Sequence, residues 1–205
     1  MRNVLEHSQC KAAWGADTSK GRAQSFDAQF PECCCEGHSL TSDRSGVAQD
    51  ELVARIFTTP DSYRQDKIEI IWNKLVRAFS DGLSMFRSGC SADEIRAAVA
   101  RLTTSGAEQT TLAGATLIEA SMVRAIGTPC RWFCVYDTDA AEFSIHSDII
   151  GTWPDRTLSK TKTELEKQTR LRSLRDAFDT SFVPSTSADE LIAQLRARNF
   201  YVVGE

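Results

Sequence analysis

The sequence has no long apolar run, no strong excess of one charge and no pattern that marks a familiar enzyme. No stretch approaches the roughly 20 apolar residues that a membrane-spanning helix requires. The 24 Lys and Arg residues nearly balance the 28 Asp and Glu residues, for a net charge of −4, so charge gives no general attraction to nucleic acid or anionic lipid. An apolar share of 41% and a charged share of 25% are ordinary globular values and exclude a disordered or collagen-like chain.

Several well-known motifs are also missing. The sequence contains no Gly-rich phosphate loop, no nucleophile elbow, no His-Glu-x-x-His helix and no RNA-binding aromatic pair. The first residues, Met1 to His7, lack the apolar core of a signal peptide. We therefore expect a soluble, cytoplasmic protein. In that compartment an odd number of cysteines, seven here, favours reduced thiols over a disulfide framework.

Hydrophobic patterning divides the chain into two parts. Residues 1–48 show neither helical nor strand periodicity over a useful window, and Gly and Pro interrupt them repeatedly. We expect an irregular, partly ordered extension that lays a few aromatic side chains on the main domain, with a separately folded zinc-bound lobe as the alternative. Residues 49–205 indicate a single α+β domain. It is expected to have a small, mostly antiparallel sheet of about three to five strands, packed with about four helices.

The local signals within residues 49–205 differ in kind. Helical spacing of apolar residues predicts a helix over 62–80, and Ser-Ala-Asp-Glu capping boxes at Ser91 and Ser187 each open a further helix. A long helix is expected over 159–178. Strands are expected over 83–87, 116–126, 131–136, 143–150 and, at an edge, 200–203. The segment 131–136 is apolar on both faces, so we place it centrally, as the hairpin partner of 116–126.

Cysteine and histidine near the N-terminus suggest a metal site. Cys35 and His38 are three residues apart, and so are His7 and Cys10. Tetrahedral zinc takes four such donors, usually as two closely spaced pairs. Neither pair is the usual Cys-x-x-Cys, however, and free cysteines in a loosely ordered arm are the alternative. Neighbouring side chains of Cys33, Cys34 and Cys35 point to opposite sides of an extended segment, so these three are not expected to converge.

The remaining cysteines carry less information. Cys130 and Cys134 share one face of a predicted strand but lie about 13 Å apart, too far for a mutual disulfide, so we interpret them as small core residues. Cys90 precedes a helix N-terminus, where the helix dipole lowers a thiol pKa. Because the sequence supplies no obvious base for it, an inert surface thiol is the favoured interpretation.

One polar cluster has the residue types of a catalytic site. Asp137 and Asp139 follow the strand 131–136, and His146 and Asp148 are two residues apart on the next strand, where their side chains share a face. A carboxylate beside a histidine supports general acid–base catalysis. Arg87, at the end of the strand 83–87, is the candidate anion anchor. A rim histidine and a solvated arginine are the alternatives.

The helix over 159–178 is basic. It contains six Lys and Arg residues and three Asp and Glu residues, and Lys160, Lys167, Arg170 and Arg175 are the candidates for contacts with nucleic-acid phosphates. A solvated helix face crossed by ion pairs, such as one between Glu166 and Arg170, is the alternative.

Three functional hypotheses follow. The first is a non-enzymatic binding module that acts through a protein partner or self-association, because catalytic motifs are missing, an edge strand is expected over 200–203 and the N-terminal arm carries aromatics. The second is a small hydrolase or transferase that uses His146 with Asp148 or Asp137. The third is a nucleic-acid-binding protein. No cofactor other than zinc and no membrane contact is expected.

Overall fold

The computed structural model describes residues 7–16, 21–104, 110–138, 145–155 and 157–204. Its centre is a six-stranded sheet in the order β6-β7-β4-β1-β5-β8, in which every neighbouring pair is antiparallel. The strands are β1 (Leu52–Thr59), β4 (Leu83–Arg87), β5 (Thr111–Glu119), β6 (Phe133–Asp137), β7 (His146–Gly151) and β8 (Phe182–Pro184). Two short strands, β2 (Tyr63–Arg64) and β3 (Glu69–Ile70), form a separate hairpin. The expected α+β class with an antiparallel sheet is confirmed, but the described residues form more strands and more helices than the three to five strands and about four helices expected.

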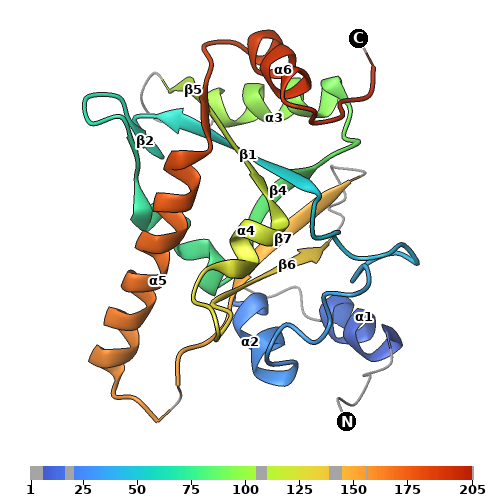
Figure 1. Cartoon of the computed structure of the whole chain (residues 1–205), viewed down its shortest axis with the longest axis vertical. Helices are drawn as coiled ribbons and strands as arrows, with labels where there is room; N and C mark the ends of the chain where they lie inside the picture. Colours follow the sequence, from blue (N-terminus) through green and yellow to red (C-terminus); the bar gives the residue numbers. More distant parts are fainter. Residues whose placement is uncertain (1–6, 17–20, 105–109, 139–144, 156, 205) are drawn as a thin grey trace.

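Seven helices occur in the part of the chain that the structure describes. They are α1 (His7–Ala16), α2 (Arg22–Gln29), the 3₁₀ helix η1 (Trp72–Phe79), α3 (Ala92–Thr104), α4 (Ala120–Ala125), α5 (Lys160–Thr180) and α6 (Ala188–Ala197). In Figure 1, α3 and α6 lie together at one end of the molecule, α1 and α2 lie at the other end, and α5 runs along one side. No described helix has the length and apolar character needed to cross a membrane.

The two faces of the sheet are covered differently. On one face, η1, α4 and α5 pack against the sheet through a cluster that contains Leu75, Val123 and Leu174; we call this the α5 face. The opposite face has two covers. Helices α3 and α6 pack over β1 and its neighbours, while apolar side chains of α1, α2 and the segment 30–40 pack on Cys134, Tyr136 and Ile150 of β6 and β7. We call the described residues of 7–48 the N-terminal lobe; its Val47 belongs to the core on the α5 face.

Both predicted capping boxes open helices, but only one is complete. The Ser91 hydroxyl accepts a hydrogen bond from the Glu94 N–H at 3.1 Å, and the Glu94 carboxylate accepts from the Ser91 N–H at 2.6 Å. At α6, Ser187 accepts from the Glu190 N–H at 3.2 Å. The Glu190 carboxylate turns instead to the N–H and hydroxyl of Thr186. Ser187 therefore satisfies a free N–H of the helix, without the reciprocal bond.

The expectation that residues 1–48 are irregular is wrong for much of the described lobe. Helices α1 and α2 bury Trp14 and Phe26, and Phe30, directly after α2, is buried too. The Phe26 ring meets Tyr136 of β6 edge-on at 5.4 Å between centroids. The expectation of reduced thiols is also wrong for four cysteines, because Cys10 is bonded to Cys35, and Cys33 is bonded to Cys134. Such contacts between distant residues leave no periodic signal in the local sequence.

The helix predicted over 62–80 is also wrong. The first part of this segment forms the β2–β3 hairpin, with Ile68 in the left-handed region at φ 53° and 78% exposed. The Ile70 N–H donates to the carboxylate of Asp179, in α5, at 2.9 Å. Only Trp72–Phe79 is helical, as η1, and it still buries Leu75 and Phe79. The apolar spacing correctly indicated which side chains of η1 are buried. The backbone conformation of the first half of the segment depends instead on Asp179, more than 100 residues away.

Two strand predictions need correction near the middle of the chain. The strand predicted over 116–126 ends at Glu119, and residues 120–125 form α4, which buries Ala120, Val123 and Arg124 at helical spacing. Strand β5 pairs with β1 and β8, not with β6. Strand β6 is an edge strand and pairs with β7. It is apolar on both faces because the N-terminal lobe covers one face and the α5-side core covers the other.

The predicted edge strand over 200–203 is wrong as well. In this segment the structure has only an isolated bridge between Ser91 and Val203. Phe200 and Val202 are buried against α3 and α6, so their side chains fill a core and do not alternate along a sheet edge. The two true edges are β6 and β8.

Candidate functional site

The described candidate catalytic residues, Asp137, His146, Asp148 and Arg87, lie near one another but on two faces of the sheet. In the β6–β7 and β4–β7 ladders, Asp137 is opposite Ser147, and Phe86 is opposite His146. Directly opposed residues share a face and consecutive residues alternate. Arg87 and Asp137 therefore belong to the α5 face, while His146 and Asp148 belong to the other face. Asp139 lies outside the described residues.

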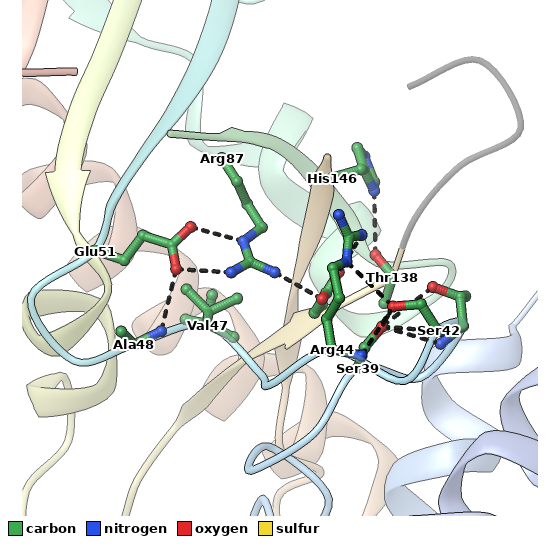
Figure 2. A network of polar contacts seen from close by, with 12 residues as sticks. Ser39, Ser42, Arg44, Val47, Ala48, Glu51, Arg87, Thr138 and His146 are labelled. Atoms are coloured by element: carbon green, nitrogen blue, oxygen red, sulfur yellow. Dashed lines mark hydrogen bonds and ion pairs between the residues drawn. The ribbon is translucent and has the colours of Figure 1, made fainter. Parts of the chain in front are cut away.

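On the α5 face, Arg87 is the centre of a buried ion network. Its Nε and Nη2 atoms donate to the two carboxylate oxygens of Glu51 at 2.7 and 2.8 Å, and its Nη1 lies 2.7 Å from Asp137 Oδ2. Figure 2 shows Arg87 with Glu51 on one side and the lobe residue Arg44 approaching from the other; Arg44 Nη2 lies 3.8 Å from Asp137 Oδ1. Burial opposes the charge, but Glu51 and Asp137 outweigh it and raise the pKa of Arg87.

This network argues against Arg87 as an anion anchor. Its side chain is only 11% exposed, and two carboxylates already neutralise it. Asp137 is fully buried and serves Arg87, so it does not orient His146. The arrangement joins the N-terminal lobe, the segment before β1 and the ends of β4 and β6. Its role in this structure is to hold those segments together.

On the other face, His146 and Asp148 are brought together as predicted, through a third residue. The Thr138 hydroxyl donates to Asp148 Oδ2 at 2.8 Å and lies 3.1 Å from His146 Nδ1. Because the single hydroxyl hydrogen is used by Asp148, Nδ1 of a neutral His146 is the donor to Thr138, and Nε2 is the basic nitrogen. Figure 2 shows Thr138 beneath the His146 ring. All three side chains are buried.

His146 also lines a cleft of about 140 Å³. The register of β1 and β4 contains only two residue pairs, Val53 with Arg87 and Ala54 with Phe86, and the cleft lies beyond them. Apolar side chains and a serine form part of its wall. The lining residues are Arg55, Ile56, Arg77, Ser84, Met85, Phe86, Ala98, Arg101, Leu102 and His146.

Three arginines from three different elements give this cleft its charge. Arg55 is in β1, Arg77 in η1 and Arg101 in α3, and the described lining contains no Asp or Glu. Arg55 Nη1 donates to the Ser84 carbonyl oxygen at 2.7 Å, but its buried Nε has no hydrogen-bond partner among the described residues. Burial, and then the neighbouring charge of Arg77, lower the pKa of Arg55 to about 10, against the opposing effect of the Asp148 carboxylate. Arg77 also lies 3.9 Å from Asp81. The lining of the cleft is therefore basic, and the Nε atom of Arg55 is its unsatisfied donor among the described residues.

The residues predicted as zinc ligands contact one another in two pairs, but the two cysteines are not free thiols. Cys10 and Cys35 are bonded to each other. His7 and His38 lie with their ring centroids 4.6 Å apart. A second group, Cys33, Glu36 and Cys134, is the one set among the described residues whose donor atoms lie within 4.8 Å of one another, and its donor types suit zinc. Its two sulfurs are also joined in a disulfide.

The candidate basic residues of α5 are mostly engaged by neighbouring groups. Lys167 lies 3.1 Å from Glu164 and over the Trp153 ring. Arg170 is buried, and it donates to the Glu166 carboxylate and the Thr152 carbonyl oxygen. Arg175 contacts three carboxylates, those of Glu69, Asp176 and Asp179. Lys160 is exposed at the start of the helix. Acidic groups therefore interrupt the positive surface, and nucleic-acid binding stays a prediction.

The other cysteines also differ from expectation. Cys90 is fully buried, not a surface thiol, and burial raises its pKa to about 12 against the direction expected from the helix dipole. Cys134 is a core residue as predicted, but disulfide-bonded, whereas Cys130 is exposed. Two disulfides are typical of proteins that fold under oxidising conditions. The cytoplasmic location remains a prediction that they do not support.

Sequence reasoning missed the residues that complete these sites. Arg55 was visible as a charged residue within an apolar segment, a recognisable signal for a functional or paired side chain. Thr138, Arg77 and Arg101 carried no such signal. Glu36, between Cys35 and His38, carried no such signal either, yet its buried carboxylate accepts from Arg124, from Arg131 and from the backbone N–H of Val135.

Comparisons with known proteins add no assignment. A scan against protein-family models, a search of curated proteins and a search of solved structures each found no match. The function must therefore be argued from the geometry of the chain itself.

Proposed function

We propose that this chain binds a small anionic ligand in the cleft between β1 and β4. The observation that carries the proposal is the convergence of Arg55, Arg77 and Arg101, from three separate elements, on a cleft whose described lining contains no carboxylate. Bringing like charges together is unfavourable, and the nearby carboxylates of Asp148 and Asp81, which partly offset the charges of Arg55 and Arg77, do not line the cleft. The buried Nε of Arg55 has no hydrogen-bond partner among the described residues and supplies a donor for an anion that enters the cleft.

The volume and the lining residues of the cleft limit the kinds of ligand that fit it. A volume of about 140 Å³ is below the roughly 300–1,000 Å³ of sites for drug-sized molecules, so the cleft accommodates a phosphoryl, sulfo or carboxyl group with a small attached portion. Phe86, Met85 and Leu102 offer apolar contact for that portion. A small organic anion therefore fits better than a nucleic acid.

Calorimetric titration with inorganic phosphate and phenyl phosphate at low salt tests this proposal. Hydrogen bonds to charged groups contribute about 1.5–3 kcal/mol, so Arg77→Gln and Arg101→Gln should each weaken binding about tenfold or more. Arg198→Gln removes an exposed arginine outside the cleft and should leave the affinity unchanged. Absence of binding by the wild type, or equal weakening by Arg198→Gln, would contradict the proposal.

A second candidate, the hydrolase or transferase hypothesis, is favoured by the Asp148–Thr138–His146 chain. These hydrogen bonds leave Nε2 as the basic nitrogen of His146, which lines the cleft. His146→Asn keeps a side-chain N–H in the place of Nδ1 but removes Nε2. If His146 is a general base, this variant should retain ligand binding and lose turnover of an aryl phosphate or aryl ester; equal turnover by both proteins would exclude that role.

The protein-partner hypothesis keeps less support from the structure. Its expected edge strand over 200–203 is not formed, and the lobe aromatics Trp14, Phe26 and Phe30 are buried within this chain. It remains a prediction, to be examined by light scattering of the purified protein.

A further inference from the structure

Four potential zinc ligands lie together in the N-terminal lobe, in an arrangement set by two pairs. His7 and Cys10 are one turn apart in α1, and they share a side of that helix. Cys10 is bonded to Cys35, with 5.9 Å between the Cα atoms. His38 follows Cys35 by three residues, and its ring centroid lies 4.6 Å from that of His7. The disulfide and the ring contact therefore both join α1 to the segment 35–38.

The hydrogen bonding of His7 suits a metal ligand. His7 Nε2 lies 2.7 Å from the backbone carbonyl oxygen of Ser39. A carbonyl oxygen only accepts, so Nε2 carries the hydrogen and Nδ1 carries the lone pair. A metal-bound histidine typically donates its other N–H to a carbonyl or carboxylate, which fixes the ring orientation. Ser39 provides this support before any metal is present.

The competing group, Cys33, Glu36 and Cys134, is a poorer place for a cation. The Glu36 carboxylate already accepts from Arg124 at 3.2 Å and from Arg131 at 2.5 Å. A zinc ion there would meet two guanidinium groups and only three protein donors. The other set, His7, Cys10, Cys35 and His38, offers two sulfur and two nitrogen donors. A zinc ion there would leave the ion pairs of Glu36 intact.

We propose that Cys10, Cys35, His7 and His38 form a redox-controlled zinc site. When the Cys10–Cys35 bond is intact, its sulfurs are bonded to each other and hold no metal. A dithiol reductant reduces this bond to two thiols and is itself oxidised to a disulfide. Zn²⁺ then displaces the two thiol protons to solvent and is held by two thiolates and two imidazole nitrogens.

Zinc binding requires a rearrangement of the four donors. Tetrahedral zinc with bonds of about 2.3 Å to sulfur places two thiolates about 3.8 Å apart, so the reduced sulfurs have to separate around the ion. In the oxidised structure no three of the four donor atoms lie within 4.8 Å of one another, so the histidine rings also have to approach the sulfurs after reduction. The disulfide and the zinc ion are then alternative links that join α1 to the segment around Cys35.

Cobalt substitution of the reduced full chain tests the site, because Co²⁺ bound by thiolate gives a charge-transfer band and visible bands. After reduction with a phosphine, the wild type should bind about one Co²⁺ per chain, and Zn²⁺ should displace it. The oxidised protein should show no such bands. Cys10→Ser and His38→Gln should weaken Co²⁺ binding about 100-fold or more. Cys34→Ser, which changes the exposed neighbour of Cys35, is the matched control and should bind normally.

A check on the fold of His38→Gln and one further variant keep the result unambiguous. His38 is exposed, so His38→Gln should form both disulfides when oxidised, which verifies its fold. Cys33→Ala should retain the cobalt bands, since Cys33 is not a ligand in this proposal. The proposal is overturned if the reduced wild type shows no thiolate–cobalt band, whether folded or not. It is also overturned if the band survives Cys10→Ser and disappears in Cys33→Ala.

Discussion

Removal of the Cys33–Cys134 disulfide should destabilise the protein more than any single surface change. The bond joins the N-terminal lobe to β6 across 101 residues. Both side chains are buried, with 5% and 1% exposure, so alanine is the appropriate replacement, because serine would bury an additional hydroxyl. The matched comparison is removal of Cys10–Cys35, which closes a loop of only 25 residues.

The expected magnitudes follow from the loop lengths. In the chain-entropy description, a crosslink restricts the unfolded chain more when it closes a longer loop. For separations of 101 and 25 residues, this description gives about 4.7 and about 3.5 kcal/mol at 25 °C. In a chain of this size 1 kcal/mol corresponds to about 2–4 °C. The double variant Cys33→Ala, Cys134→Ala should therefore melt about 10–20 °C below the wild type.

Guanidinium unfolding of the oxidised proteins measures both differences, and non-reducing peptide mapping verifies the remaining bond. A variant with Cys34→Ser and Cys130→Ser, which changes two exposed free thiols, serves as the control and should unfold like the wild type. The reasoning is refuted if the 101-residue crosslink proves no more stabilising than the 25-residue one. It is also refuted if mapping of the wild type shows Cys33 and Cys134 unlinked.

Three smaller predictions concern single side chains and are measured by denaturant unfolding. Asp137→Asn removes a buried charge that faces Arg87 at 2.7 Å and should cost about 3 kcal/mol; a loss below about 1 kcal/mol, typical of exposed pairs, would refute it. Ser91→Ala removes the hydroxyl that caps the Glu94 N–H and should cost about 1 kcal/mol; unchanged stability would show that α3 does not depend on this cap. The raised pKa of Cys90 means that the folded state keeps its thiol proton while the unfolded state loses it, so stability should fall as pH rises from about 9 to about 12. Cys90→Ala should remove this part of the alkaline loss, and an identical pH profile would contradict the assignment.

Local signals predicted the elements that depend on local chemistry. The capping serines Ser91 and Ser187 located the starts of α3 and α6, since a cap and its helix lie within four residues. The long helix over 159–178 matches α5, whose Ser159 cap and inward Leu171 and Leu174 are close in sequence. Strand β4 matches the predicted 83–87. In these elements the pattern and the stabilising contacts coincide.

Prediction failed where contacts with distant residues decide the structure. The Ile70 N–H donates to the Asp179 carboxylate, and the lobe residue Cys33 is bonded to Cys134. Such contacts override the weak preferences of short segments. The interpretation of β6 shows the same limit: its two apolar faces correctly indicated burial, but they could not distinguish a central strand from an edge strand that a distant segment covers.

The candidate site was also predicted only in part, because the sequence pattern shows placement within one strand but not contacts between strands. His146 and Asp148 were expected to share a face because strand side chains alternate, and they do. The residue that connects them, Thr138, lies on the adjacent strand and carried no sequence signal. Asp137 was grouped with them by proximity in sequence. The pairing of β6 with β7 places it on the opposite face instead.

The treatment of arginine within this chain supports a ligand in the cleft. Buried arginines elsewhere have carboxylate partners supplied by the chain: Arg87 meets Glu51 and Asp137, and Arg124 meets Glu36. The arginines of the cleft are compensated less closely. The charge of Asp148 offsets the burial of Arg55 only in part, Asp81 lies 3.9 Å from Arg77, and the described lining itself supplies no carboxylate. Among the described residues the buried Nε of Arg55 has no hydrogen-bond partner, so it is a donor that a molecule bound there can use. The tendency of the rest of the chain to neutralise its buried cations makes the cleft the place where an external anion is expected.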